Sequence, residues 1–323
     1  MTCDCSLIVI GEMNTDIIVT GLPRFPKAGE LINGGKLFIG PGGKSRNIAA
    51  MAAALLPTGR VAMVSRTSQD KYGLWKEPVE ALKQIGVNTK FVKIIDSQVT
   101  VELPGIALIL VDQHGNNQII GAPGITRKFS PEDIDEADEL FKEVEKNNGF
   151  MVFIGNCPIQ TAKHAIIKAR KLGIKIVFDP GGADDLKSLI TLLGDDIYLF
   201  KPNEHEARVM TGVNILDLPS AKKAAKVFMK MGVENVLITV GSNGAYLFTP
   251  DSDIHIPVPA VKESAEKDET GCGDQTMAAI CALLLQDTSL YEAAKSAILA
   301  GTLQFHRRGI VPVTPTDLIK VST

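Results

Sequence analysis

The chain has 323 residues, of which 45% are hydrophobic and 22% are charged, and its formal net charge is −3. These values are typical of a globular protein with a sizeable core, built as one large α/β domain or as two smaller ones. They exclude a basic nucleic-acid-binding protein, and the longest apolar run, 278–285, is far shorter than the roughly 20 residues that span a bilayer.

The start of the chain lacks the basic segment and the long apolar core of a secretion signal. Five cysteines in a chain of this length predict reduced thiols rather than a disulfide framework. The five histidines are scattered, without the spacing of metal ligands. We therefore expect a cytoplasmic protein.

The first predicted strand is 6–11, a short apolar run that ends in a glycine and suits a buried parallel strand. Asn14 and Asp16 follow it, and residues two apart on a strand share a face. An amide and a carboxylate paired in this way could bind neighbouring hydroxyl groups. Both could equally be turn residues, because Asn and Asp favour turns.

A glycine-rich stretch, 40–43, leads through four polar residues into a predicted helix, 48–56. Gly43-Lys44-Ser45 is similar to the end of a P-loop, but that motif requires a glycine where this chain has Phe38, so we reject a P-loop. A lesser prediction remains. Gly42 and Gly43 would let a ligand approach the backbone, and Lys44 and Asn47 would offer polar groups to it. The alternative is a glycine turn before a helix.

Strands alternate with helices over most of the remaining chain, which predicts a parallel sheet covered by helices on both faces. We predict strands at 61–64, 150–154, 174–178, 196–200 and 235–240, and helical segments at 71–85, 131–147, 159–172, 203–211 and 219–231. Ligands of such sheets bind beyond the carboxyl ends of the strands. Asn156, Asn203 and Gly241 each follow a predicted strand and are therefore candidate site residues.

Two segments have strand character without helices. The first covers 20–40, and the second covers 91–122, with a hairpin at Asn116-Asn117. We expect the two segments to join in a second sheet that is set apart from the core.

The segment 268–274 precedes a predicted helix that includes Met277, Cys281 and Leu284. Gly271 and Gly273 allow a tight turn, and the free N–H groups of the first helical turn form an anion-binding site. A carboxylate beside a bound phosphate suits a general base that takes a proton from the attacking group, and Asp274 has this place. Alone, Asp274 could equally be a first-turn acid favoured by the helix dipole.

Together these motifs resemble the ribokinase-like carbohydrate kinases, also called the PfkB family. The resemblance extends over nearly the whole chain and rests on motifs in the expected order: Asn14-x-Asp16 after Gly11, Gly42-Gly43-Lys44-x-x-Asn47, Asn203-x-x-Glu206 within 201–206, 237–244, and Asp268 to Asp274. It implies one domain over 1–323, with a Rossmann-like, doubly wound and mostly parallel α/β sheet. A β-sheet lid would be formed by about 12–41 and 91–122, and it could also pair with a second lid in a homodimer.

The resemblance implies transfer of the γ-phosphate of ATP, with Mg²⁺, to a hydroxymethyl group of a sugar. Asp274 would be the base, and the amides of Gly271, Cys272 and Gly273 would hold the phosphate oxygens. The sugar side would comprise Asn14, Asp16, Gly42, Gly43, Lys44, Asn47 and Asn156.

The nucleotide side would comprise Asn203, Glu206, Thr239, Gly241 and Gly244. Glu206 would act on Mg²⁺ through water, although Asn203 and Glu206 also fit a helix capping box. Thr239 and Gly241 could equally be a strand end and a turn glycine. Asp268 would lie at the family's monovalent cation site, with K⁺ as the candidate ion.

Five positions depart from the family pattern. Glu269 replaces a common Thr beside the cation site, and Asn156 stands where ribokinases have an acid that binds the sugar. Cys272 could have a lowered thiol pKa at the helix N-terminus or be a small filler. Ser45-Arg46 replaces two small residues, and Arg46 could bind a substrate phosphate, stack on a base or be a solvated residue at the helix start.

The predicted activity is that of an ATP-dependent sugar kinase. The alternatives among enzymes are a nucleoside kinase acting on an adenosine-, inosine- or pseudouridine-like substrate, or a kinase for a phosphorylated sugar. The alternative of another class is a non-catalytic regulator that binds a sugar or a nucleotide. A base at Asp274 favours an enzyme, because binding alone does not need one.

Overall fold

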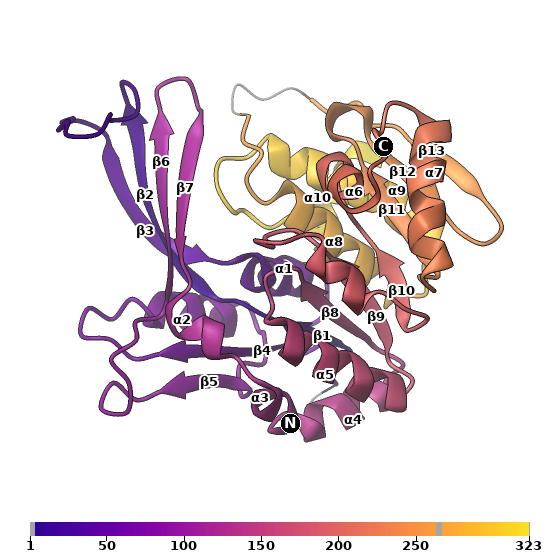
Figure 1. Ribbon diagram of the computed structural model, residues 1–323, viewed down its shortest axis with the longest axis horizontal. Coiled ribbons are helices and arrows are strands. Elements are labelled where there is room, and N and C mark those ends of the chain that lie inside the picture. The colour runs from indigo at the N-terminus through magenta and orange to yellow at the C-terminus, as the bar shows by residue number, and fades with distance from the viewer. Residues whose placement is uncertain (1–3, 263–266, 323) are drawn as a thin grey trace.

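Two β-sheets organise the computed structural model, which describes residues 4–262 and 267–322 (Figure 1). The large sheet has the strand order β13-β12-β11-β10-β9-β8-β1-β4-β5. Neighbours from β5 to β11 pair in parallel, whereas β12 pairs antiparallel with both β11 and β13. The strands are β1 (Leu7–Ile10), β4 (Val61–Ser68), β5 (Val92–Ile95), β8 (Phe150–Ile154), β9 (Lys175–Asp179), β10 (Ile197–Phe200), β11 (Asn235–Thr239), β12 (Ala245–Phe248) and β13 (Asp253–Ile256).

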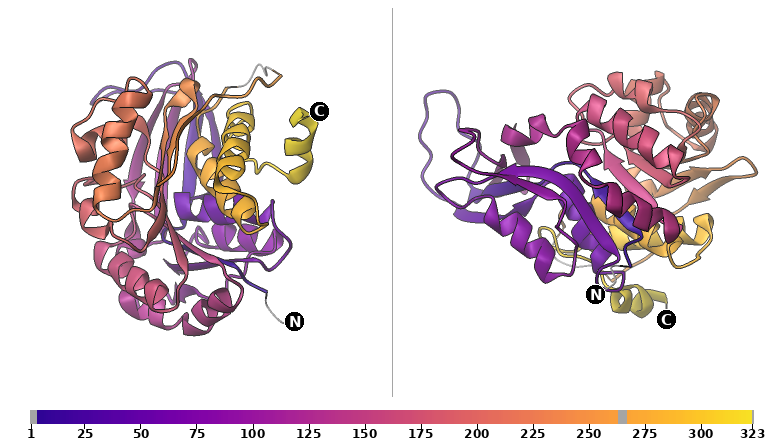
Figure 2. Two further views of the ribbon diagram at one scale, coloured as in Figure 1. Left: turned by 90° about the vertical axis from the view of Figure 1, so that its right-hand side faces the viewer. Right: turned by 90° about the horizontal axis from the view of Figure 1, so that it is seen from below.

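Helices cover both faces of the large sheet because alternate residues of its buried strands point to opposite sides. In β1, Ile8 and Ile10 pack into one core, and Leu7 and Val9 pack into the other. The first core lies under α3 (Pro131–Asp135), α4 (Asp138–Lys146), α5 (Ile159–Lys171), α6 (Glu204–Thr211) and α7 (Leu218–Lys230). The second lies under α1 (Lys44–Ala53), α2 (Lys76–Gln84), α8 (Cys272–Leu284), α9 (Leu290–Phe305) and α10 (Pro315–Ser322). In the left view of Figure 2, the orange helix α7 and the yellow helix α9 lie on opposite sides of the sheet.

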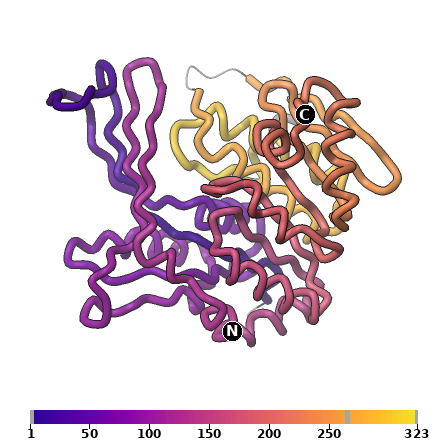
Figure 3. Tube along the Cα trace, viewed as in Figure 1, coloured from indigo at the N-terminus to yellow at the C-terminus, as the bar shows by residue number. Residues whose placement is uncertain are grey.

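The small sheet has the order β3-β2-β6-β7 and projects away from the body of the molecule (Figures 1 and 3). Its strands are β2 (Asn14–Leu22), β3 (Lys36–Gly42), β6 (Gly105–Asp112) and β7 (Asn117–Ala122). Parallel pairing of β2 with β6 joins two antiparallel pairs that are distant in the sequence. The predicted fold class, a doubly wound and mostly parallel α/β sheet with a separate small β-sheet, is confirmed.

Several predicted boundaries differ from the structure. The segment 91–122 reaches one strand too far, because β5 pairs with Ser65–Ser68 of β4 in the large sheet. The predicted helix 131–147 is two helices, α3 and α4, which meet at Glu136 and Ala137. In 71–85 the helix begins only at Lys76, since the preceding turn contains Gly73 with φ 74°. The sequence did not predict β12, β13, α9 or α10.

Short 3₁₀ helices complete the described chain at η1 (Gly124–Lys128), η2 (Ser188–Leu192) and η3 (Gly241–Asn243). Within residues 4–262 and 267–322, no helix is both long enough and apolar enough to cross a membrane.

Candidate active site

A cavity of about 980 Å³ lies between the small sheet and the carboxyl edge of the large sheet. Ile106, Ile109 and Ile119 line it from the small sheet. The opposite wall comes from segments that follow β1, β8 and β9, and from the turn before α8. This is the edge at which open parallel sheets bind ligands.

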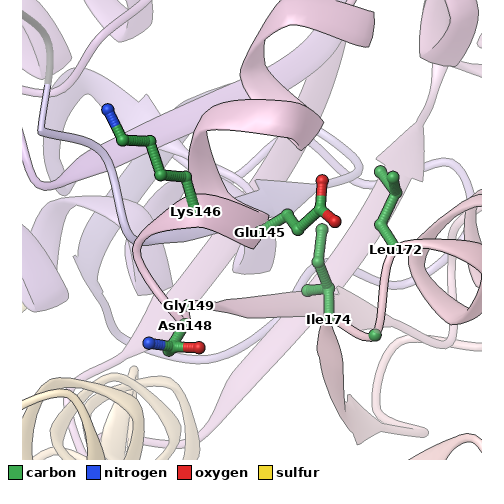
Figure 4. Close-up of a pocket in the computed structure, with 7 residues that line it drawn as sticks. Glu145, Lys146, Asn148, Gly149, Leu172 and Ile174 are labelled. Atoms are coloured by element: carbon green, nitrogen blue, oxygen red, sulfur yellow. The ribbon is translucent and has the colours of Figure 1, made fainter.

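A second hollow, of about 490 Å³, lies at the other edge of the large sheet, beside the amino ends of β8 and β9 (Figure 4). Its lining residues are Glu145, Lys146, Asn148, Gly149, Leu172, Gly173 and Ile174. None of the predicted site residues is among them. The larger cavity is therefore the candidate active site.

The structure brings most of the predicted sugar-side residues to the large cavity. Its lining includes Asn14, Asp16, Gly43, Lys44, Asn47 and Asn156, together with Gly271 and Asp274. The side-chain oxygens Oδ1 of Asn14 and Asn156 are buried and have no hydrogen-bond partner in the described structure. Because buried polar atoms are nearly always satisfied, these two acceptors are suited to hydroxyl groups of a ligand.

Gly42 lies at the end of β3, opposite Asn14 in the β2–β3 register. A Cβ at this position would lie 1.9 Å from Oδ1 of Asp16. A side chain at residue 42 would therefore displace the Asp16 carboxylate, and the glycine lets the carboxylate lie against the backbone.

Asp274 lies in the first turn of α8 and is only 4% exposed. Asn47 donates a hydrogen bond to it, with Nδ2 3.1 Å from Oδ2. The ammonium nitrogen of Lys44 lies 3.5 Å from the other oxygen, Oδ1. The negative charge of Asp274 is the main cause that raises the pKa of Lys44 above its usual value, so Lys44 stays charged.

The turn before α8 has the shape of an anion-binding site. Gly271 has φ 76°, a left-handed conformation that favours glycine. Gly273 is exposed, so its amide is accessible to a ligand. The amide of Cys272, in contrast, donates to the carbonyl oxygen of Glu269, with an N-to-O distance of 3.3 Å.

The thiol of Cys272 is not activated. Burial, followed by the charges of Asp268, Glu269 and Asp274, raises its pKa to about 12. The alternative that the helix N-terminus lowers this pKa is therefore wrong, because the nearby carboxylates and desolvation outweigh the dipole. Cys272 is a protonated side chain that fills space, with Sγ 3.6 Å from the carbonyl oxygen of Asp268.

Arg46 is 5% exposed, which contradicts the alternative of a solvated residue at the helix start. It is not among the residues that line the cavity. Burial lowers its pKa to about 10, against the opposing charges of Asp16 and Glu77. Its guanidinium therefore lies near Asp16 and Glu77, with NH1 3.4 Å from Oδ1 of Asn47 and with Nε buried and without a hydrogen-bond partner in the described structure.

Asp16 has a raised pKa of about 6. Burial is the main cause, and the neighbouring charge of Glu12 is the second. Glu12 also orders this part of the site, because its carboxylate accepts hydrogen bonds from Asn14 Nδ2 and from the amide of Lys44, each at 3.1 Å. Glu12 was not predicted from the sequence, although its position directly after Gly11 at the end of the first strand was a usable signal.

A buried ion pair that was not predicted from the sequence lies beside the anion-binding turn. Lys201 Nζ is 2.6 Å from Oδ2 of Asp179, and the two residues are 3% and 8% exposed. The ammonium also lies 3.9 Å from where a Cβ of Gly273 would be. Asp179 ends β9 and Lys201 follows β10, so their places at strand ends could have indicated the pair.

The predicted nucleotide-side residues lie at the ends of β10 and β11, outside the lining of the cavity. Asn203 and Thr239 form an isolated parallel bridge. Asn203 and Glu206 also form the reciprocal capping box of α6, with both hydrogen bonds at 2.8 Å. At Gly241 a Cβ would meet nothing within 4 Å, whereas at Gly244 it would lie 2.0 Å from the carbonyl oxygen of Ile256. Packing against β13 thus explains the glycine at 244.

The carboxylates of Asp179 and Glu206 converge at Gly181, close to the capping box of α6. A Cβ on Gly181 would lie 2.8 Å from Oδ1 of Asp179 and 3.4 Å from Oε1 of Glu206. Burial, and then the charge of Asp179, raises the pKa of Glu206. In residues 4–262 and 267–322, no group of three or more His, Cys, Asp or Glu residues could hold a metal ion by itself.

Comparisons with known proteins agree with this architecture. A family model described as pfkB family carbohydrate kinase matches residues 5–317. A ribokinase of Mus musculus is 32% identical over 280 residues, which are 85% of this chain and 80% of that protein. A deoxyribokinase of Salmonella typhi is 29% identical over 303 residues, 94% of this chain and 93% of that protein.

Among solved structures, the ribokinase of Arabidopsis thaliana complexed with ribose and ATP superposes with a TM-score of 0.84. It is 27% identical in sequence, and the match covers 98% of each chain. The family match extends over nearly the whole chain, from the first strand of the large sheet to the last helix. The chain therefore belongs to the pfkB family of carbohydrate kinases.

Proposed function

We propose that this chain is an ATP-dependent kinase that transfers the γ-phosphate to a hydroxymethyl group of a sugar. One observation carries the proposal. Asp274, a buried carboxylate held by Asn47 and Lys44, lines the cavity together with residues of the anion-binding turn. The solved relative with ribose and ATP supports the choice of sugar and donor.

In this proposal, Asp274 accepts the proton of the hydroxymethyl group as that oxygen attacks the γ-phosphate. Oδ1 of Asn14 and Oδ1 of Asn156 accept hydrogen bonds from other hydroxyl groups of the sugar and orient it. The carboxylate of Asp16 does the same when it is ionised. Asp274 and these acceptors lie along the wall of one cavity, which suits a substrate with several hydroxyl groups.

Two ammonium groups of the chain lie close to the proposed position of the transferred group. Lys44 lies beside Asp274 and close to Gly181, and Lys201 lies beside Gly273. The amides of Gly271 and Gly273 add hydrogen-bond donors at the N-terminus of α8. Preorganised charges and donors of this kind stabilise the oxygens of the phosphoryl group in the transition state.

The residues present fit a bound Mg²⁺. Asp179 and Glu206, the two carboxylates that converge at Gly181, lie beside Lys44 and Lys201, and Mg²⁺ binds through one or two carboxylates, waters and substrate phosphates. Lys201 and Lys44 already oppose the repulsion from Asp179 that helps to raise the pKa of Glu206, and a bound cation would oppose it further. When bound, Mg²⁺ would neutralise charge on the phosphates.

The position of Arg46 favours a free sugar over the other acceptors. Arg46 could have bound a substrate phosphate or stacked on a base, but it is buried and does not line the cavity. We also place the enzyme in the cytoplasm, because Cys157, Cys272 and Cys281 are free thiols.

We propose further that a second copy of the chain covers the outer face of the small sheet. Ile109 and Ile119 line the cavity, so their neighbours Leu108 and Ile120 point to the opposite face. Leu37, Ile39, Leu108 and Ile120 lie on that face and are between 41% and 62% exposed. A contiguous apolar face of this kind marks an interface. A dimer in sedimentation that the Ile120→Lys variant abolishes would support this pairing, whereas a monomeric wild type would contradict it.

The proposed function is tested by ADP formation from Mg-ATP with a panel of free sugars, phosphosugars and nucleosides. We expect turnover with a free sugar, and a loss of about 10²–10⁴-fold in kcat for the Asp274→Asn variant. The matched control is Asp287→Asn, which changes the same side chain beyond the other end of α8. Nucleotide binding without turnover on any acceptor would instead indicate a non-catalytic regulator.

A further inference from the structure

Two segments of the chain meet directly behind the anion-binding turn. One is the turn itself, 268–271, and the other is the loop that follows α9, 306–313. The amide of Asp268 donates to the carbonyl oxygen of Phe305 at 2.9 Å. Both oxygens of the Asp268 carboxylate accept backbone N–H groups, from Thr270 at 2.9 Å and from Gly309 at 2.8 Å. The carboxylate therefore joins the two segments.

The side chain of Gln304 lies between the same two segments. Gln304 is in the last turn of α9 and is fully buried. Its Nε2 donates to the carbonyl oxygen of Gly309 at 2.5 Å and to that of Thr270 at 3.3 Å. The same nitrogen lies 3.9 Å from where a Cβ of Gly271 would be. The amide thus supports the anion-binding turn from behind.

Other side chains bind further backbone groups of this loop. Arg307 donates from NH1 to the carbonyl oxygens of Val311 at 3.2 Å and Pro312 at 2.8 Å, and its NH2 pairs with Asp317 at 2.9 Å. Oε1 of Gln275 accepts the amide of Val313 at 2.9 Å. Three carbonyls of this loop, those of Gly309, Val311 and Pro312, therefore face donors that belong to the chain, one of them a permanent cation.

This donor pattern does not fit the monovalent cation that the family resemblance implies near Asp268. Such a cation is held by oxygen atoms, mainly backbone carbonyls. The carbonyls that flank Asp268 here, those of Thr270 and Gly309, already accept the N–H groups of one amide. An NH₂ group carries partial positive charge at its hydrogens, so it would repel a cation placed between these oxygens.

The orientation of the Gln304 amide follows from the same contacts. With nitrogen and oxygen exchanged, Oε1 would face both carbonyl oxygens, and such a group of acceptors would need a cation among them. In the observed orientation Nε2 makes two hydrogen bonds, while Oε1 has no partner in the described structure. The two orientations therefore correspond to a cation-independent and a cation-dependent enzyme.

We propose that the side-chain amide of Gln304 takes the place of the monovalent cation, so that this chain transfers phosphate without K⁺. The inference rests on the proposed kinase function. An intramolecular donor holds the turn 268–271 in shape at all times, so the turn does not depend on an ion from solution.

The first experiment uses the full-length wild-type protein, Mg-ATP and the best sugar of the panel, in chloride salts of K⁺, Na⁺ or tetramethylammonium at equal ionic strength. We expect the same kcat in all three salts. A kcat that falls when tetramethylammonium replaces K⁺ would overturn the inference. Absence of ADP formation in every salt would instead contradict the proposed function, so the two failures are distinguishable.

The second experiment removes the amide in the Gln304→Ala variant, which frees the carbonyls of Thr270 and Gly309. We expect this variant to need K⁺ for turnover and to gain thermal stability with K⁺ in the absence of substrates, which the wild type does not. The matched control is Gln286→Ala, whose amide donates to Leu55 and Ala282 at the other end of α8. A Gln304→Ala variant that is fully active without K⁺ would contradict the role of the amide. Should this variant not fold, the thermal stability of the wild type with and without K⁺ still decides, because K⁺-specific stabilisation would overturn the inference.

Discussion

Asn47 donates a hydrogen bond to Asp274, and these residues belong to two helices, α1 and α8, whose N-termini meet at the cavity. The two side chains are 6% and 4% exposed, so water cannot replace the bond easily. One carboxylate oxygen of Asp274 is engaged by Asn47, and the other faces Lys44 and the cavity. The amide therefore fixes the direction in which the proposed base points.

We predict that the Asn47→Leu variant has a lower kcat with an unchanged KM for ATP. The change leaves a buried oxygen of Asp274 without its donor, which costs about 1–3 kcal/mol, or roughly ten- to a hundredfold in rate if the cost appears in the transition state. Steady-state kinetics with both substrates would measure this. A variant with wild-type kcat would show that Lys44 alone positions the carboxylate.

The raised pKa of Asp16 predicts a pH dependence of sugar binding. With a pKa of about 6, Asp16 is ionised and able to accept hydroxyl groups above that pH, and it is protonated below it. We expect kcat/KM for the sugar to fall as the pH decreases through about 6. In the Asp16→Asn variant this acid limb should be absent and kcat/KM low throughout. Persistence of the limb in the variant would assign it to another group.

The raised pKa of Asp16 also predicts a pH dependence of stability. Sugar binding should improve as the pH rises, whereas the free energy of unfolding should decrease. Burial raises the pKa of Asp16 from 3.8 to about 6, so the folded protein binds this proton more tightly than the unfolded chain. The contribution of Asp16 to the free energy of unfolding therefore decreases as the pH rises from 3.8 to about 6, and it is constant above. Asp16→Asn should be more stable than the wild type at pH 8, with a smaller difference at pH 4, in denaturant unfolding.

Gly42 provides a steric test of the sugar site. In Gly42→Ala the new Cβ would lie 1.9 Å from Oδ1 of Asp16, so the carboxylate must move. We expect KM for the sugar to rise roughly ten- to a hundredfold, the value of one hydrogen bond to a charged group, while KM for ATP stays unchanged. The matched control is Gly40→Ala on the same strand, where a Cβ meets nothing within 4 Å. Equal effects of both variants would contradict the role of Asp16.

The buried pair of Lys201 and Asp179 predicts coupled effects on stability and catalysis. Lys201→Met leaves the Asp179 carboxylate buried without its partner, which should cost about 3–5 kcal/mol of stability. The double variant with Asp179→Leu should recover part of this loss of stability. The single and the double variant should both have reduced turnover, because each lacks the ammonium group that we place beside the phosphoryl group.

Breaking the exposed pair in Lys83→Met provides the control for this prediction. Lys83 pairs with Glu80, and both side chains are about half exposed, so the loss should be at most about 1 kcal/mol. Denaturant unfolding and kcat together separate the two roles of Lys201. Wild-type turnover in a folded Lys201→Met variant would leave this lysine with a structural role alone.

Much of the fold could be predicted because its signals are local. Each buried strand is a short apolar run, and the glycines at 42, 43 and 271 mark turns that lead directly into helices. The capping box of Asn203 and Glu206 lies within four residues of sequence. Contiguous motifs of this kind report backbone conformation, so they located the anion-binding turn and the ends of the strands without any knowledge of the tertiary structure.

Contacts between residues that are far apart in the sequence could not be predicted. Asn47 and Asp274 are separated by 227 positions, and Gln304 and Thr270 by 34. The burial of Arg46 near Asp16, the pairing of β5 with β4, and the ion pair of Asp179 with Lys201 depend on how the sheets and helices pack. A residue type in a sequence does not reveal whether its side chain will face solvent, a ligand or another element.

By itself the sequence thus determined most of the strands and helices, the glycine turns and the positions of the candidate groups, since these depend on neighbouring residues. Only the tertiary structure decided which groups meet and how each is charged, as with the protonated thiol of Cys272 and the half-buried carboxylate of Asp16. It also decided that an amide from α9 lies against the anion-binding turn. The physical reason is that burial, desolvation and hydrogen-bond partners arise from packing between segments that are distant in the chain.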